Sequence, residues 1–435
     1  MKAITEAEKT IPVLGQYEVI VCGGGPAGVS AAIAAGRSGA RTLLIELGGC
    51  LGGVWTSGLL SYVLDNGGKK GLLDEIRERL KAMDGYLHEP HPTAVGSSYD
   101  GSEDFTYDAE SMKLLLEEMC EQAGVDVLLH TRVAAVHKQG RSIAAVVTEG
   151  YGGRCAYAGK TFVDCTGNGE FAAQAGCGYD TGHPQTGKIQ PASMLMVVSG
   201  IPEAQTSTLT KQDKRAFLQL LQEAGVESSY KNPTIFRLPH PDLCCIMLNH
   251  QYAVPCDSAE LITRATIEGR KEVYRAVKAL AAMPGWERLR LVTTANHIGL
   301  REGRRIHGLY KVTVDDLLNG QTFPDPVCLV KLPVDVHALE PSKEYDSLNQ
   351  GLSTKPYHIP YRSLIARDLD NLAMAGRCIS GDFYAHASYR VTGNSVPLGE
   401  AAGIAAALSS RTGARFADID GSVVTRELEA RGYTF

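Results

Sequence analysis

The sequence lacks several patterns that would assign it to a protein class at once. Its 11 cysteines include no Cys-x-x-Cys pair, although metal sites and disulfide frameworks usually show paired spacings. It has no long run of Lys or Arg and a formal net charge of −6, which argues against nucleic acid as the main partner. We therefore predict no metal site, and reduced, mostly buried thiols in a cytoplasmic protein.

A long uninterrupted apolar run is also missing. Residues 19–36 carry no charge, but Gly and Pro interrupt them repeatedly, whereas a membrane-spanning helix needs about 20 strongly apolar residues. The residues before this stretch are mixed in charge, unlike the positive start of a secretory signal. We find no internal repeat or low-complexity tract either. The sequence therefore predicts no membrane span.

What the stretch "VIVCGGGPAGVSAAIAAGRSGARTLLIE" contains is a strand, a glycine turn, a helix and a second strand. We predict strands at 17–22 and 42–45, with a helix from about 26 to 38. In the Gly-x-Gly-x-x-Gly pattern, Gly23 permits the turn, Gly25 lets the backbone approach a pyrophosphate, and Gly28 lets the helix pack on the strand. Glu46 follows at the spacing expected for an acid that binds ribose hydroxyls. The pattern predicts a dinucleotide site.

Two further junctions between a strand and a glycine lie far along the chain. Thr166-Gly167 follow a buried strand at 161–165, and Gly376-Arg377 follow the short apolar segment "NLAMA". A glycine-rich segment, "LGGCLGGVWTSGLL", follows Glu46 and suits a backbone wrapped around an extended cofactor. One cofactor held by separated segments favours FAD over NAD.

With these motifs the chain resembles the FAD-dependent oxidoreductase family, within the two-dinucleotide-type flavoproteins of the glutathione reductase superfamily. The segments "CGGGPAGVSAAIAA", "GCLGGVWTSGLL", "DCTGNGEFAAQAG" and "NLAMAGRCISGDFYAHASYRV" carry the resemblance. Trp55 and Leu60 stand where disulfide-type members have their redox cysteines, so we expect no dithiol chemistry. The resemblance implies that Val133 lies near the adenine and that Asp382 binds the ribityl chain. It also implies a helix, beginning near 398–401, that points at the flavin pyrimidine.

The predicted cofactor is FAD, and the predicted FAD-binding residues come from all of these segments. They are Gly23, Gly25, Pro26, Ala27, Gly28, Glu46, Leu47, Cys50, Gly52, Gly53, Thr56, Val133, Thr166, Gly167, Gly376, Arg377, Asp382, Asn394 and Ala401.

The predicted fold class is α/β. A Rossmann-like FAD-binding domain, with a parallel sheet and a β-meander, comprises residues 16–185 and 355–412. It is interleaved with a mixed α+β substrate domain at 186–354, and a C-terminal extension covers 413–435. The polar segment 84–104 is predicted to be an exposed excursion.

Candidate catalytic residues must be able to reach the flavin. His386 could accept a proton while a hydride leaves to the flavin, since its ordinary pKa is about 6.5. Arg390 could bind a substrate carboxylate or oxyanion. Arg305, in "REGRRIHG", faces either an anionic substrate or an ion pair between domains. The resemblance places His337 and Tyr361 in the same cavity.

We therefore expect two-electron oxidation of a C–OH or C–N carbon in a small polar metabolite, such as a sugar derivative or a hydroxy acid. Two alternatives stay open: flavin-dependent reduction of an activated C=C bond, and a non-redox protein that keeps FAD structurally. The expected partners are a small-molecule substrate and an electron acceptor that the sequence does not identify. Formation of a homo-oligomer stays open.

Overall fold

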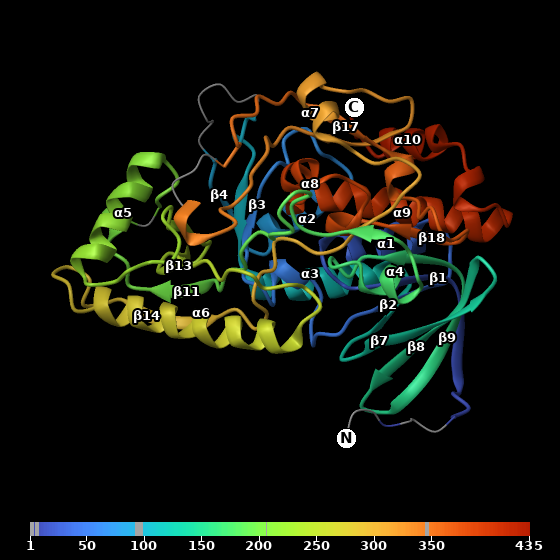
Figure 1. The fold of residues 1–435 in the computed structure, drawn as a ribbon, viewed down its shortest axis with the longest axis horizontal. Helices are drawn as coiled ribbons and strands as arrows, with labels where there is room; N and C mark the ends of the chain where they lie inside the picture. The colour runs from blue at the N-terminus through green and yellow to red at the C-terminus, as the bar shows by residue number, and fades with distance from the viewer. Residues whose placement is uncertain (1–3, 5–7, 92–98, 206, 344–347) are drawn as a thin grey trace.

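A mixed sheet of seven strands organises the larger part of the molecule in the computed structural model, which describes residues 4, 8–91, 99–205, 207–343 and 348–435 (Figure 1). The strand order is β6-β2-β1-β9-β8-β7, and β18 also pairs with β9. The strands are β1 (Val13–Cys22), β2 (Thr42–Ile45), β6 (Val125–Leu128), β7 (Arg132–Gln139), β8 (Ser142–Gly150), β9 (Gly153–Asp164) and β18 (Leu372–Met374).

The parallel strands end in one row. β1 pairs in parallel with β2 and β9, and Cys22 lies opposite Ile45 on one side and Asp164 on the other. Met374 of β18 lies opposite Asp164 as well. β7, β8 and the first half of β9 pair antiparallel, as a meander. The predicted α/β class is confirmed, and the carboxyl ends of β1, β9 and β18 meet at one edge of the sheet.

Helices α1 (Pro26–Arg37) and α9 (Thr392–Thr412) pack on one another beside this edge (Figure 1). Their small residues bring the two backbones together. A Cβ at Gly399 would overlap the Ala27 carbonyl oxygen, and one at Gly403 would overlap that of Ala31. The contact fixes the start of α9 relative to the glycine turn. The remaining helices of this part are α2 (Leu72–Ala82), α3 (Ala109–Gln122), α4 (Glu170–Gln174), α7 (Val314–Asn319), α8 (Phe383–Tyr389) and α10 (Gly421–Ala430).

A second sheet, of order β12-β13-β11-β14, lies with α5 and α6 at the other end of the molecule (Figure 1). These elements have a hydrophobic core of their own, formed by residues between 192 and 298. Ile306, Val312 and 327–336 contribute to the first core instead. The predicted substrate domain, 186–354, is therefore divided between two cores. The elements are β11 (Met196–Ser199), β12 (Thr234–Arg237), β13 (Leu243–Met247), β14 (Arg290–Thr294), α5 (Lys211–Glu223) and α6 (Ala259–Leu280).

The described residues also form three small sheets. They are β3 (Tyr62–Val63), β5 (Phe105–Tyr107) and β4 (Tyr86–His88); β10 (Tyr179–Asp180) with β15 (Arg305–Ile306); and β16 (Pro326–Val330) with β17 (Tyr357–Pro360). None of the described helices combines the length and the apolarity needed to cross a membrane.

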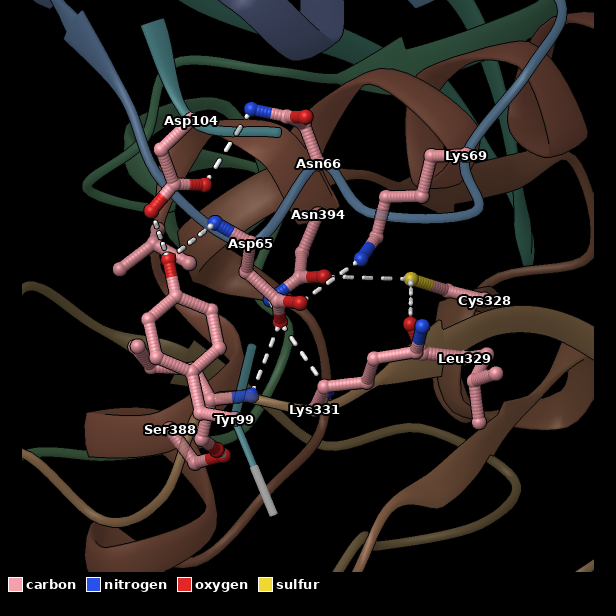
Figure 2. A network of polar contacts seen from close by, with 12 residues as sticks. Asp65, Asn66, Lys69, Tyr99, Asp104, Cys328, Leu329, Lys331, Ser388 and Asn394 are labelled. Carbon is pink, nitrogen blue, oxygen red and sulfur yellow. Dashed lines mark hydrogen bonds and ion pairs between the residues drawn. The ribbon is translucent and has the colours of Figure 1, made fainter. Parts of the chain in front are cut away.

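The segment predicted as an exposed excursion, 84–104, includes residues 92–98, which lie outside the described residues. Tyr99 and Asp104 are buried, so the prediction is wrong for this part of the segment. The reason is a polar network inside the protein (Figure 2). The Tyr99 hydroxyl donates to Asp104 and accepts the Asp65 N–H at 3.1 Å.

Asp65 is the centre of this network (Figure 2). Its side chain is fully buried, and its Oδ1 lies 3.0 Å from Lys69 Nζ. Its Oδ2 accepts the backbone N–H groups of Lys331 and Leu332, both at 3.1 Å, and Asn394 Nδ2 at 3.0 Å. One carboxylate thus joins the loop after β3, the strand end after β16 and the first turn of α9.

Burial raises the pKa of the second carboxyl group in the network, that of Asp104, to about 8. The nearby charge of Asp65 also raises this pKa, whereas the hydrogen bond from Tyr99 lowers it. An unfolded Asp ionises near pH 4. Between about pH 4 and pH 8 the folded protein therefore holds a proton that the unfolded chain has lost, so this group makes the stability fall as pH rises through that window.

We predict that Asp104→Asn removes this pH dependence. The free energy of unfolding of the variant, relative to that of the wild type, should rise between pH 6 and pH 8 by up to about 1.4 kcal/mol per pH unit. Urea unfolding at pH 6, 7, 8 and 9 measures this difference. Asp242→Asn, at an exposed position, is the control. Parallel stability profiles for wild type and Asp104→Asn would contradict the prediction.

Candidate active site

The glycine loop between β1 and α1 contains the three glycines of the motif, and one of the three, Gly25, has open space beside it. Gly23 has φ +100°, and a Cβ there would lie 2.5 Å from the Cys165 carbonyl oxygen. A Cβ at Gly28 would overlap the Gly23 carbonyl oxygen. At Gly25, by contrast, no atom of the described residues lies within 4 Å of a Cβ built on the backbone. Gly25 precedes α1, whose free N–H groups and positive dipole end suit a phosphate.

Glu46 lies directly beside this loop. Its Oε2 accepts the Gly24 N–H and its Oε1 accepts the Gly48 N–H, both at 2.6 Å. The Gly52 N–H donates to the Gly24 carbonyl oxygen at 2.8 Å, so the chain after Glu46 returns to the loop. This places a carboxylate next to the phosphate cradle, as binding of a ribose requires.

The segment after Glu46 wraps over the loop. A Cβ at Gly53 would lie 3.0 Å from Gly25 Cα, and Thr56 Oγ1 donates to the Leu51 carbonyl oxygen. Cys50 is half-buried, with its Sγ 3.3 Å from Ser57 Oγ, whereas Leu47 is exposed. A cleft of about 520 Å³ borders the segment; its lining includes Gly48, Gly49, Cys50, Ser57, Lys113, Asn296 and His297.

The other two junctions between a strand and a glycine, at Gly167 and Gly376, lie beside the glycine loop and the start of α1. Gly167 and Gly376 both have positive φ, +74° and +80°. Arg377 Nη2 donates to Asn168 Oδ1 at 3.1 Å, and its guanidinium lies against Gly167. A Cβ at Gly376 would lie 3.1 Å from Ala27 Cβ, at the start of α1. Thr166 is held by Asp164, whose Oδ1 accepts its N–H and its hydroxyl.

Three predicted FAD contacts have other surroundings. α9 begins at Thr392, not near 398–401, so the buried Ala401 lies in mid-helix; the prediction began the helix after Pro397, but the helix contains this proline. Asn394 donates to Asp65. Both oxygens of Asp382 accept backbone N–H groups, from Ala385 at 2.8 Å and Val314 at 2.7 Å, so Asp382 links α8 to α7.

Val133 is half-buried on β7, opposite Thr148 of the meander. Its carbonyl oxygen accepts Gln174 Nε2 at 3.4 Å.

His386, on α8, is fully buried. Neither ring nitrogen has a hydrogen-bond partner among the described residues. Burial and the neighbouring charges of Arg305, Arg390 and Arg377 hold the pKa of His386 well below its usual range. The imidazole is therefore neutral, and it lies where three arginines from different elements converge.

Arg305 and Arg390 are each fixed by a carboxylate. Arg305 Nη1 donates to Glu302 Oε1 at 2.7 Å, and its Nη2 donates to the Gly182 carbonyl oxygen at 2.9 Å. Arg390 Nη2 donates to Asp335 Oδ2 at 2.8 Å and to the Asp335 carbonyl oxygen at 3.0 Å. The structure thus brings both arginines close enough to His386 to act on it electrostatically.

His337 reaches this group through Asp335. Its Nε2 lies 3.4 Å from Asp335 Oδ2, and its Nδ1 lies 3.0 Å from His250 Nε2. Burial disfavours the charge of Asp335, yet His337, Arg390 and Arg301 together hold its pKa well below the usual range. Burial and Arg301 also hold the pKa of His337 well below its usual value. With both ring nitrogens engaged, His337 orients Asp335.

Tyr361 lies elsewhere. Its hydroxyl donates to the Phe416 carbonyl oxygen at 3.0 Å, and its buried ring packs against Gly421 at the start of α10. Its contacts are thus with the C-terminal extension, toward which the chain turns after β17, and a cavity shared with His337 stays a prediction.

Sequence reasoning missed Asp335, His250 and Gln190. Gln190 Oε1 accepts the His337 N–H at 3.1 Å, and the Gln190 N–H donates to Glu302 Oε2 at 3.1 Å. Asp335 stands two residues before His337 in "PVDVH", a spacing that could have suggested a pair. His250 and Gln190 carry no such local signal.

Among solved structures the chain is similar to several enzymes and enzyme-like proteins at low identity. A geranylgeranyl bacteriochlorophyll reductase-like protein from Thermoplasma acidophilum is 13% identical, with a TM-score of 0.48 over 96% of this chain and 83% of the other. The p-nitrophenol 4-monooxygenase from Pseudomonas putida is 11% identical, with a TM-score of 0.49 over 95% and 84%. The flavin-dependent brominase Bmp2 is 13% identical, with a TM-score of 0.48 over 95% and 83%.

No curated protein sequence matches the chain significantly. The family model described as FAD dependent oxidoreductase matches residues 18–428, almost the whole chain. This match includes the glycine loop, Glu46, both later glycine junctions and His386. The protein is an enzyme that uses FAD, and the chain belongs to the FAD-dependent oxidoreductase family.

Proposed function

We propose that the protein oxidises a C–OH or C–N carbon of a small polar metabolite, such as a sugar derivative or a hydroxy acid, with His386 as the catalytic base. The observation that carries this proposal is the neutral, buried imidazole of His386, whose two nitrogens are unpaired within the described residues. We also propose that the fold is of the glutathione reductase type and that the enzyme is cytoplasmic.

The residues around the glycine loop fit FAD. The open position at Gly25, before α1, would hold the pyrophosphate, and the carboxylate of Glu46 would hold the ribose. The two other glycine junctions meet the loop at the start of α1, as the binding of one extended molecule requires. When bound, FAD supplies the two-electron acceptor that takes a hydride from the substrate carbon.

His386 would accept the proton of the substrate hydroxyl or amino group as the hydride leaves. Its low pKa keeps it neutral and able to accept that proton at physiological pH. A T-shaped contact with the Tyr389 ring, with 5.6 Å between centroids, fixes the plane of the imidazole. The proton leaves the substrate oxygen or nitrogen, the hydride leaves the adjacent carbon, and a C=O or C=N bond remains.

The glycine loop offers a clean test of the cofactor site. We predict that Gly25→Val folds normally but loses FAD, because its side chain enters space that no described protein atom occupies. Gly28→Val should fail to fold, because its Cβ overlaps the Gly23 carbonyl oxygen. FAD absorbance per protein and thermal unfolding of the apoprotein report the two effects. A Gly25→Val protein with full FAD content would contradict the assignment of the pyrophosphate.

The catalytic role of His386 predicts a slow reductive half-reaction in His386→Gln. A panel of sugars, hydroxy acids and amines is first screened for anaerobic bleaching of the wild-type flavin. With a substrate that bleaches it, His386→Gln should reduce the flavin about 10² to 10⁴-fold more slowly while keeping its FAD. His137→Gln, at an exposed histidine of β7, is the control. Bleaching of His386→Gln at the wild-type rate would reject His386 as the base. Reoxidation of reduced flavin by an enoate, without bleaching by alcohols or amines, would favour C=C reduction instead.

The low pKa of His386 also predicts the pH profile of flavin reduction. Because an unperturbed histidine becomes protonated below about pH 6.5, an ordinary base would lose activity there. For His386 the neutral form persists below that pH, so the wild-type rate of flavin reduction should stay constant from pH 8 to pH 6. Stopped-flow reduction at substrate concentrations far below saturation measures this, because the second-order rate reports the protonation of the free enzyme. A tenfold loss of rate between pH 7 and pH 6 would contradict it.

A further inference from the structure

We propose that the substrate is a carboxylate, with the anionic group next to the carbon that is oxidised, and that Arg305, Arg390 and Gln190 bind it. This inference rests on the proposed function, since it names the substrate class of the same site. The substrate class is therefore a 2-hydroxy or a 2-amino carboxylate. Its oxidation would give a 2-oxo or 2-imino carboxylate, with the hydride transferred to FAD and the proton to His386.

The first observation is a set of buried donors without a partner among the described residues: Arg305 Nε, Arg390 Nε and Gln190 Nε2. Arg305 is 3% exposed and Gln190 is 2% exposed. More than nine in ten buried polar groups in folded proteins have a hydrogen-bond partner. All three unpaired atoms are N–H donors, so the ligand that suits them offers acceptors alone, as a carboxylate does.

Hydrogen bonds join these donors into one cluster. Glu302 accepts Arg305 on one oxygen and the Gln190 N–H on the other, at 2.7 and 3.1 Å. Gln190 Oε1 accepts the His337 N–H at 3.1 Å.

From His337 the cluster continues to Asp335 and then to Arg390, at 3.4 and 2.8 Å. Arg305 and Arg390 are therefore the two ends of one chain of contacts. The Arg390 N–H donates to the His386 carbonyl oxygen at 3.1 Å, one turn along the chain, and both arginines act electrostatically on His386. We therefore place the anion-binding donors and the base in one site.

The charge of this site also favours an anion. Arg301, Arg305, Arg377 and Arg390 all influence its histidines, and among the described residues Glu302 pairs with Arg305 and Asp335 with Arg390. Lys214 of α5 adds a further positive charge near Asp335. A neutral metabolite would leave this positive excess uncompensated in a buried site, whereas one carboxylate would reduce it.

Among the described residues, the contacts of both arginines with the protein are made by the terminal Nη atoms of the guanidinium and not by Nε. Arg390 contacts Asp335 through Nη2, and Arg305 contacts Glu302 and Gly182 through Nη1 and Nη2. The Nε donors of both have no partner among the described residues and can therefore bind a second one. The two carboxylates thus fix the arginines without saturating them, which is the arrangement of a rigid, prepared binding site.

The test uses oxalate, a carboxylate without a C–H bond to oxidise, so binding is measured without turnover. The purified FAD protein is titrated with oxalate, and with glycolamide as the neutral comparison, while the flavin absorbance spectrum is recorded. We expect a saturable spectral change with oxalate and none with glycolamide. In Arg390→Gln the Kd for oxalate should rise at least tenfold.

Arg362→Gln is the matched control, because Arg362 also pairs with an aspartate, Asp325, at 3.0 Å, but outside this cluster. The Kd of Arg362→Gln for oxalate should equal that of the wild type. Arg390→Lys is the second variant if Arg390→Gln does not fold; it keeps the charge without the planar fork and should weaken oxalate binding as well.

The outcomes separate this inference from the proposed function. Neutral alcohols that bleach the flavin, with no binding of oxalate, would overturn the carboxylate and leave the oxidation standing. Oxalate binding that depends on Arg390, with no bleaching by any substrate, would uphold the carboxylate site and remove the oxidation. If Arg390→Gln instead loses FAD but its remaining holoprotein binds oxalate normally, the arginine serves the flavin and the inference is wrong.

Discussion

The buried carboxylate of Asp65 is the interaction on which the arrangement of the site depends. It accepts hydrogen bonds from the backbone at Lys331 and Leu332 and from Asn394 in the first turn of α9. Asp335 follows Leu332 by three residues, and Arg390 precedes Asn394 by four. Asp65 therefore holds together the two segments that supply the Asp335–Arg390 ion pair. A carboxylate without these partners would be costly to bury, so the interaction fixes one relative position of the segments.

The two halves of the site are held by different physical means. The cofactor side depends on close backbone packing of Gly23, Gly28, Gly399 and Gly403, where any side chain would collide with a carbonyl group. The proposed substrate side depends on ion pairs, in which Glu302 and Asp335 orient Arg305 and Arg390. Packing gives a rigid surface for a large ligand that stays bound. Oriented charges would allow the small anion that we propose as substrate to bind, react and leave.

The sequence predicts those parts of the structure whose interactions join residues close together in the chain, and it fails where the partners lie far apart in the chain. The helix at 26–37, the strand at 42–45 and the glycine turn between them were predictable, because their signals lie within about thirty residues. The start of α9 was not, because the packing of Gly399 and Gly403 on α1 sustains a helix through Pro397 that local propensity disfavours. The roles of Asp65 and His250 depend on partners 329 and 87 residues away, which no local pattern contains.

The arginines around His386 bear on the role of base that we propose for this buried histidine. Burial alone already favours the neutral imidazole, and three neighbouring positive charges favour it further. The same charges would oppose protonation of His386 during the reaction unless a negative charge arrived with the substrate. A bound carboxylate supplies that charge and lowers the cost of forming the imidazolium beside Arg305 and Arg390. Substrate binding would therefore activate the base that the empty site keeps weak, and the anionic group would contribute to catalysis as well as to recognition.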